Sequence, residues 1–272
     1  MSSSKPNMQQ APSNEKFRRI YIPQKGWKLV DSDYSSAELY LAAYLSKDVK
    51  MLWAIENKLD LHSYSAYQIF GQLWLDAGGE EMPAGKPKTK EANNMRKLSK
   101  GCSFSILYGT GVVAFSENAG MALSKGKEVL KAYYATFPKL VAFFKMSGQE
   151  ALKHNYVREP FFGRVRFFTT PTNGMEVSHN KNAGMNYKPQ ASNSSIMKYA
   201  MCLMKKYIET HDIKHKVRLL LTVHDQQTSE AREDFAEEWA EIQTELMEKA
   251  ALHAIPEGTL KSETEILNHW TK

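Results

Sequence analysis

The stretch WKLVDSDYSSAELYLAAYLSKD, at residues 27–48, gives the clearest indication of the fold. Its first seven residues form an extended, mostly apolar run that ends in acid. Residues 35–45 then place apolar side chains at helical spacing behind a serine that can cap the helix. This order predicts a strand, a turn and a helix, with Asp33 at the end of the strand.

A second run of this kind lies near the other end of the chain. VRLLLTV, at 217–223, is short and almost purely apolar, which is typical of a buried strand, and Asp225 follows it closely. Strands near both ends with helices between them predict an α+β fold rather than a regular βαβ alternation. A further strand is expected within 162–168 and a loop at 76–93. Helices are expected within 51–75, at 94–108, on either side of Pro138 within 125–154, at 189–210 and at 231–253.

Composition limits the classes of function. The 272 residues are 42% hydrophobic and 24% charged, which is typical of a globular protein and argues against a disordered one. The net charge of +6 permits a polyanionic partner without requiring one. Two cysteines cannot by themselves form a disulfide scaffold or a structural zinc site. Because no apolar run reaches about 18 residues and no signal peptide is evident, we expect a cytoplasmic protein with no membrane span.

Four residues at successive i+4 steps form a stripe on the helix expected at 94–108. They are Arg96, Lys100, Phe104 and Tyr108, and such spacing keeps them on one broad face. The cations could hold phosphates, and the rings could stack on a base and sugar. Spacing alone favours the plainer alternative of a solvated basic end followed by an aromatic core end.

Asp33 and Asp225 are candidate metal ligands because each follows a strand that would hold it rigidly. Two such carboxylates can hold two ions about 3.5–4 Å apart, an arrangement suited to in-line displacement at phosphorus. Mg²⁺ is the expected ion because it takes few carboxylates and keeps waters and substrate phosphates. Each aspartate could equally be an ordinary turn residue, and their distance along the chain cannot pair them.

Several polar residues occupy positions that otherwise look apolar. They are Glu38, Asn186, Gln190 and His224, and each would need a partner or a ligand if buried. A solvated face would explain Glu38 equally well, and helix capping would explain Asn186. His62, within DLHSYS, has a structural role as its commoner alternative.

Six segments together resemble family A DNA polymerases, in the order that the family has them. Six matches in order, over nearly the whole chain, are far more specific than any one of them. Composition alone indicates a flexible leader at residues 1–16. The matches replace that interpretation for 2–13, and they also replace the interpretation of 96–108 as a chance stripe. The matches are 2–13 with SSxxPNLQNIP, 33–48 with the palm motif DYSxIELRxxAxLSxD, 60–71 with DIHTxTAxxIFG, 96–109 with the fingers motif RxxxKxxNFGxxYG, 186–198 with NxxxQGTxADIxK, and 223–226 with the palm motif VHDE.

The resemblance implies a right-hand polymerase fold that lacks the thumb. An antiparallel palm sheet would be built from residues 1–48 and 156–272, and a helical fingers subdomain at 49–155 would be inserted between them. The implied function is template-directed DNA synthesis, in which a deoxynucleotide is transferred to a primer 3′-hydroxyl by a two-metal mechanism. Primer–template DNA and deoxynucleoside triphosphates are the implied partners.

The resemblance also assigns roles around the incoming nucleotide. Asp33 and Asp225 would hold two Mg²⁺ ions. Arg96, Lys100 and His62 would grip the triphosphate, and Lys100 could donate a proton to the leaving pyrophosphate.

Further implied roles concern the base, the sugar and the DNA. Phe104 would pack on the incoming nucleotide, and Tyr108 would lie beside the templating position. Glu38 would occupy the place of a 2′-hydroxyl and so exclude ribonucleotides, with Tyr108 as its hydrogen-bond partner. The residues expected to contact the minor groove and primer end are Arg164, Asn186, Gln190, His224 and Gln226.

The chain departs from the family pattern at several positions. Gln226 replaces the glutamate of VHDE, so we expect a reduced or altered metal dependence. Phe104 stands where some members have tyrosine, which predicts discrimination against dideoxynucleotides. The remaining changes, which suggest a divergent lineage of phage origin, are Ser36, Tyr40, Ser103, Ser105, Ala191 and Ser192.

The family's thumb and exonuclease segments have no counterpart in this sequence. We therefore expect a split enzyme, active in replication in the host cytoplasm, whose second polypeptide carries the thumb and exonuclease and covers an apolar palm edge. The main alternative is a degenerate, non-catalytic module that binds primer–template. A metal-dependent nuclease is a weaker alternative, because it has no use for the stripe of Arg96, Lys100, Phe104 and Tyr108. A single-subunit RNA polymerase is also weaker, because Glu38 would exclude ribonucleotides.

Overall fold

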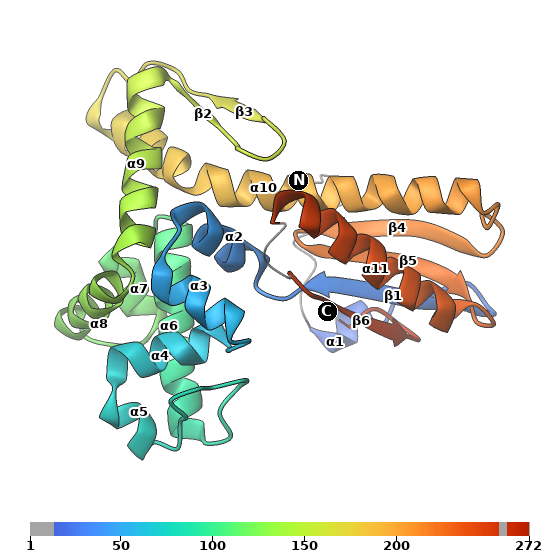
Figure 1. Ribbon diagram of the computed structural model, residues 1–272, viewed down its shortest axis with the longest axis horizontal. Coiled ribbons are helices and arrows are strands. Elements are labelled where there is room, and N and C mark those ends of the chain that lie inside the picture. The colour runs from blue at the N-terminus through green and yellow to red at the C-terminus, as the bar shows by residue number, and fades with distance from the viewer. Residues whose placement is uncertain (1–13, 256–259, 272) are drawn as a thin grey trace. The chain divides into compact units, whose positions relative to one another are not determined.

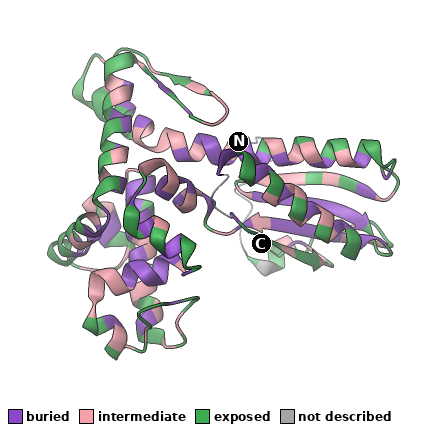
Figure 2. Cartoon of the chain, in the orientation of Figure 1, coloured by how far each residue is buried: buried purple, intermediate pink, exposed green. Residues whose placement is uncertain are grey.

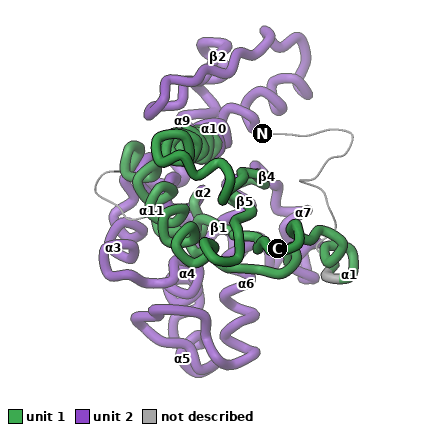
Figure 3. Tube along the Cα trace, turned by 90° about the vertical axis from the view of Figure 1, so that its right-hand side faces the viewer, with its two compact units in different colours: residues 1–37, 192–272 green, residues 38–191 purple. Residues whose placement is uncertain are grey.

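A computed structural model describes residues 14–255 and 260–271 of the chain (Figure 1). The segment 2–13, which carries one of the resemblances, lies outside these residues. The chain divides into two compact units, residues 1–37 with 192–272, and residues 38–191 (Figure 3). The division means that the first unit is built from both ends of the chain.

The first unit contains a four-stranded antiparallel sheet in the order β4-β5-β1-β6. The antiparallel sheet confirms the predicted α+β class. Helix α11 packs on β1, β5 and β6, and the part of α10 from residue 192 onward contacts β4 and α11. The elements are α1 (Glu15–Arg18), β1 (Trp27–Tyr34), β4 (Val217–Val223), β5 (Gln226–Arg232), α11 (Ala236–Ala254) and β6 (Ser262–Leu267), with α10 (Gly174–Thr210) shared by both units.

The face of the sheet beneath α11 is held by a polar network as well as by apolar packing. The Tyr34 hydroxyl donates to the Met247 carbonyl at 2.5 Å, and Trp239 is fully buried. Gln243 donates from its amide nitrogen to Ser32 at 2.7 Å and accepts from Ser229 at 2.5 Å. Because these buried polar groups satisfy one another, a strand as polar as β5 can lie inside the sheet.

The second unit is mainly helical. Its core contains Tyr133, Phe137, Leu140 and Phe144, all fully buried (Figure 2). Its elements are α2 (Ala37–Ser46), α3 (Val49–Glu56), α4 (Leu61–Phe70), α5 (Gln72–Asp76), α6 (Lys90–Leu107), α7 (Val112–Asn118), α8 (Leu123–Thr136), α9 (Pro138–His154), the hairpin β2 (Tyr156–Arg158) and β3 (Val165–Phe167), and the first part of α10.

Some element bounds differ from those expected. The helix expected at 94–108 begins at Lys90, because the Thr89 hydroxyl caps its first turn. The helix expected at 189–210 begins at Gly174 and continues through Pro189. The strands β5 and β6 had no sequence prediction because their residues are mostly polar. The predicted palm and fingers bounds at 48 and 155 fall inside the second unit and remain predictions.

No helix in the described part of the chain is both long enough and apolar enough to cross a bilayer.

Candidate functional site

The sheet places Asp33 and Asp225 at the same end of neighbouring strands. Asp33 lies opposite Gln226 in the β1–β5 ladder, and the Tyr34 amide donates to the Asp225 carbonyl at 3.3 Å. His224 and Asp225 form the two-residue connection between β4 and β5, with His224 in the left-handed region at φ 53°. The fold therefore brings together two aspartates that sequence spacing could not pair.

The donor set at this edge suits a hard cation. Asp33 and Asp225 are both half-buried, and oxygen ligands of this kind are those that Mg²⁺ accepts together with water and phosphate oxygens. Within residues 14–255 and 260–271 there is no group of three or more His, Cys, Asp or Glu side chains that could hold a metal by itself. The two carboxylates thus fit a cation that a substrate helps to bind, and they do not fit a structural zinc site.

Gln226 is buried and holds a carboxylate that sequence reasoning missed. Its amide nitrogen donates to Asp31 Oδ2 at 2.6 Å, and the Thr228 hydroxyl donates to Asp31 Oδ1 at 2.6 Å. The signal in the sequence was the repeat of acids in VDSD, because residues two apart on a strand share a face. The structure places both Asp31 and Asp33 on the face that carries Gln226.

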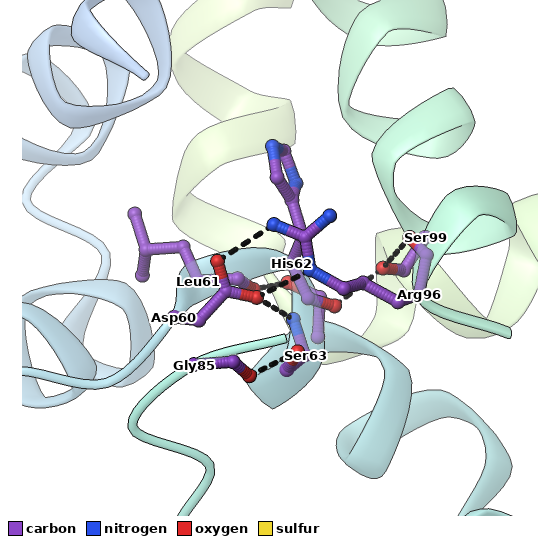
Figure 4. Close-up of polar contacts among 8 residues, drawn as sticks. Asp60, Leu61, His62, Ser63, Gly85, Arg96 and Ser99 are labelled. Carbon is purple, nitrogen blue, oxygen red and sulfur yellow. Dashed lines mark hydrogen bonds and ion pairs between the residues drawn. The ribbon is translucent and has the colours of Figure 1, made fainter. Parts of the chain in front are cut away.

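In the second unit, Arg96 on α6 forms a bidentate ion pair with Asp60 (Figure 4). Its Nε and Nη2 donate to the two Asp60 oxygens at 2.8 Å each. Asp60 also caps α4 by accepting from the Ser63 amide at 2.8 Å. Burial alone would raise the pKa of Asp60, but the hydrogen bonds from Arg96 and Ser63 and the charge of Arg96 lower it to about 2. Two of the three guanidinium nitrogens of Arg96, which was expected to bind a triphosphate, therefore already donate to Asp60.

His62 follows directly in α4 and is only 4% exposed. Burial lowers the pKa of His62 to about 4; Asp60 works against this lowering, and Arg96 and Lys100 add to it. The ring is therefore neutral at pH 7, and its centroid lies 6.4 Å from that of Phe104. His62 can offer a hydrogen bond to a ligand but no positive charge at this pH.

The stripe expected at 96–108 also includes two exposed aromatic rings. Phe104 is 40% exposed and Tyr108 51%, and their centroids are 5.7 Å apart. The Lys100 ammonium lies 5.2 Å from the centroid of Phe104. A hollow of about 560 Å³ adjoins Phe104 and is also lined by Lys97 and Phe115. Exposed rings beside a cation form a surface on which a base could stack.

The other predicted residues of the second unit lie on α2, between β2 and β3, and on α10. Glu38 is half-buried in the first turn of α2. Arg164 is exposed, and its Nη1 donates to the Ala191 carbonyl at 3.4 Å. Asn186 lies on α10 within 3.4 Å of where a side chain at Gly109 would begin, and Gln190 follows one turn later. The predicted hydrogen bond between Glu38 and Tyr108 remains a prediction.

These features define a class of protein that has paired strand-end carboxylates on an antiparallel sheet and a basic, aromatic helix face. A family model described as DNA polymerase family A matches residues 1–272. The chain belongs to DNA polymerase family A.

Similar proteins agree with this assignment. The chain is 30% identical to the thermostable DNA polymerase I of Thermus thermophilus and 29% identical to DNA polymerase I of Synechocystis sp., each over 94% of its own length. It spans 29% and 26% of the lengths of these relatives. The fold resembles a solved structure of the POL domain of Pol1 from M. smegmatis in complex with DNA primer–template and dNTP. The TM-score is 0.84 at 23% identity, over 99% of this chain and 45% of that one.

Proposed function

We propose that this chain is the palm and fingers portion of a DNA-directed DNA polymerase that transfers deoxynucleotides to a primer 3′-hydroxyl. The observation that carries the proposal is the placement of Asp33 and Asp225 at the same end of β1 and β5. Membership of DNA polymerase family A supports the reaction class. The palm would comprise residues 1–48 and 156–272, and the fingers residues 49–155.

Asp33 and Asp225 would hold two Mg²⁺ ions. When bound, these ions would lower the pKa of the primer hydroxyl and offset the charge that develops on the transferred phosphorus. The aspartates keep their places because β1 and β5 hold the backbone on which they stand. Lys100 would donate a proton to the leaving pyrophosphate.

The second unit would bind the nucleotide. Arg96 would face the triphosphate with the nitrogen left over from its pair with Asp60, and neutral His62 would add a hydrogen bond. Phe104 would pack on the incoming nucleotide, and Tyr108 would lie beside the templating position. Glu38 would exclude a 2′-hydroxyl, and the DNA contacts would come from Arg164, Asn186, Gln190, His224 and Gln226.

A second polypeptide with a thumb and exonuclease is a separate part of the proposal. Apolar side chains on the first unit support it, because Ile20, Ile22 and Leu220 are each more than half exposed around a hollow of about 390 Å³. Adding a candidate thumb-bearing chain to a silent extension assay should restore synthesis. If synthesis stays absent with every such chain, this part of the proposal is wrong.

The second candidate function is a module that binds primer–template without extending it. The observation that favours it is Gln226, which replaces an acid beside Asp33 and donates to Asp31. The presence of Asp33, Asp225 and the α6 stripe together argues for catalysis, because a module that only binds DNA does not need them.

Primer extension by the purified chain with Mg²⁺ and deoxynucleotides tests the proposal. Asp225→Ala should abolish extension, whereas Asp234→Ala, which removes an exposed partner of Arg232, should leave it unchanged. Extension that survives Asp225→Ala would contradict the assignment of Asp225. If neither protein extends a primer even after a thumb-bearing chain is added, but both bind it with equal affinity, the binding module is the better explanation.

A further inference from the structure

Asp31, Asp33, Gln226 and Thr228 share one face of the sheet. The ladder pairs Asp31 with Thr228 and Asp33 with Gln226, and cross-strand partners in an antiparallel sheet point to the same side. The opposite face carries Ser32 and Ser229, which contact Gln243 of α11. The four residues thus lie on the face opposite α11, where Asp31, Gln226 and Thr228 are all buried.

Asp31 fixes the orientation of the Gln226 amide. Asp31 is fully buried, Gln226 is 7% exposed, and a carboxylate can accept a hydrogen bond only from the amide nitrogen. The nitrogen of Gln226 therefore faces Asp31, and its carbonyl oxygen is turned away. A glutamate at position 226 would instead set one buried carboxylate against another, which costs free energy.

We propose that Asp31 is a positioning residue that supplies the negative charge Gln226 lacks and turns the Gln226 carbonyl oxygen outward as a cation ligand. The proposal rests on the proposed function, because the cation is the one that Asp33 and Asp225 would hold. Amide carbonyl oxygens are accepted by hard cations alongside carboxylates. Asp31 and Gln226 would then do jointly what a single glutamate does in the family pattern.

A purely structural role for Asp31 is the competing explanation. Burial lowers the pKa of Arg18, and the charge of Asp31 works against this lowering, so the two groups interact. Asp31 could therefore serve only to anchor α1, which ends at Arg18. The two explanations predict different results when Gln226→Glu is added to Asp31→Asn. The new carboxylate at position 226 can restore the negative charge near the cation, but it cannot restore the interactions that Asp31 makes with its neighbours.

Four proteins decide between these explanations: the unaltered chain, Asp31→Asn, Gln226→Glu and the double variant. Mn²⁺ binding is measured by electron paramagnetic resonance below the melting temperature of every protein. Asp31→Asn should weaken Mn²⁺ binding about tenfold, because it removes one charge near the cation while keeping a similar shape. The double variant should regain most of that affinity. Equal binding by Asp31→Asn and the unaltered chain, or a double variant no better than Asp31→Asn, would overturn the proposal.

Thermal melting in EDTA gives a readout without any cation. Gln226→Glu should lower the melting temperature by about 5 °C because two buried carboxylates then face each other, and adding Asp31→Asn should reverse the loss. A Gln226→Glu protein that melts like the unaltered chain would also overturn the proposal.

Asp33→Asn separates this inference from the proposed function. It should abolish Mn²⁺ binding if the cation site is where we place it. If Asp33→Asn binds Mn²⁺ normally, the proposed metal site is wrong, and the cation role of Asp31 is wrong with it. If Asp33→Asn abolishes binding while Asp31→Asn does not change it, only the inference about Asp31 is wrong.

Discussion

Asp60 links the stability of the second unit to acid pH. Its pKa is lowered from 3.8 to about 2 in the folded chain, so the folded state favours the ionised form. This preference adds about 2 kcal/mol to the free energy of unfolding above pH 4, and that contribution is lost as the pH falls toward 2. We expect Asp60→Asn to lower the free energy of unfolding by about that amount at pH 7 and to flatten its decline below pH 4.

Urea denaturation at a series of pH values measures this effect. Glu128→Gln is the matched control, because it removes the carboxylate of a well-exposed ion pair with Lys125, and it should change the stability by less than about 0.5 kcal/mol. If Asp60→Asn has the same pH profile as the unaltered chain, Asp60 does not cause the loss of stability below pH 4.

His62 makes the stability of the second unit depend on pH between about 4 and 6.5. Its pKa of about 4 in the folded chain lies below the usual histidine value of 6.5, so the folded state disfavours the proton. Neutral His62 therefore contributes fully to the stability above pH 6.5. As the pH falls toward 4, the free energy of unfolding decreases by about 3 kcal/mol. His62→Gln should remove this decline while keeping a hydrogen-bonding side chain. An unchanged decline between pH 6.5 and 4 in the Gln variant would show that another group is responsible.

Among the elements, α9 and α10 meet through small residues. A Cβ added at Gly184 of α10 would lie 2.3 Å from the Cβ of Ala151, and one added at Gly148 of α9 would lie 2.7 Å from Met185 Cγ. We expect Gly184→Ala to lower the free energy of unfolding by about 1–3 kcal/mol, although alanine is the better helix former. Gly174→Ala is the control, since nothing lies within 4 Å of a Cβ at that position of the same helix. A Gly184→Ala protein as stable as this control would show that the two helices can separate without cost.

The same contact explains why the sequence predicted only part of α10. Pro189 removes a backbone donor, so local preference places a helix start there. The helix nevertheless runs from Gly174, because its first turns pack on α9 through Gly184. Strand 217–223 was predicted correctly from its apolar run, whereas β5 was not, because its buried residues are polar and depend on partners such as Gln243. Local pattern is informative where burial is apolar and uninformative where a distant side chain satisfies the buried group.

The candidate site follows the same rule. Motif order was enough to name Asp33, Asp225 and the α6 stripe before the fold was known. It did not reveal Asp31 or Asp60, because each is defined by a partner far along the chain, Gln226 and Arg96 respectively. The residues that we propose to contact a substrate lie in recognisable motifs, while those that we propose to position them are found only through tertiary contacts.

At the scale of the whole molecule, the two units differ in how the chain builds them. Residues 38–191 are continuous and contain their own core, including Met51, Leu107, Tyr133 and Phe144. The sheet of the other unit needs β1 from the start of the chain, because β1 lies between β5 and β6 from its end. The contiguous unit should therefore fold alone, whereas the C-terminal segment should not.

Two fragments test this difference. Residues 38–191 expressed alone should show helical circular dichroism and a cooperative thermal transition. Residues 192–272 alone should show neither a sheet signal nor a cooperative transition, because removing β1 leaves the inner edges of β5 and β6 without a partner. Adding a peptide of residues 14–37 should restore a transition to the second fragment, since it returns the central strand. If the 38–191 fragment is unfolded, its core depends on the rest of the chain, and the polymerase fold assembles as one cooperative unit rather than two.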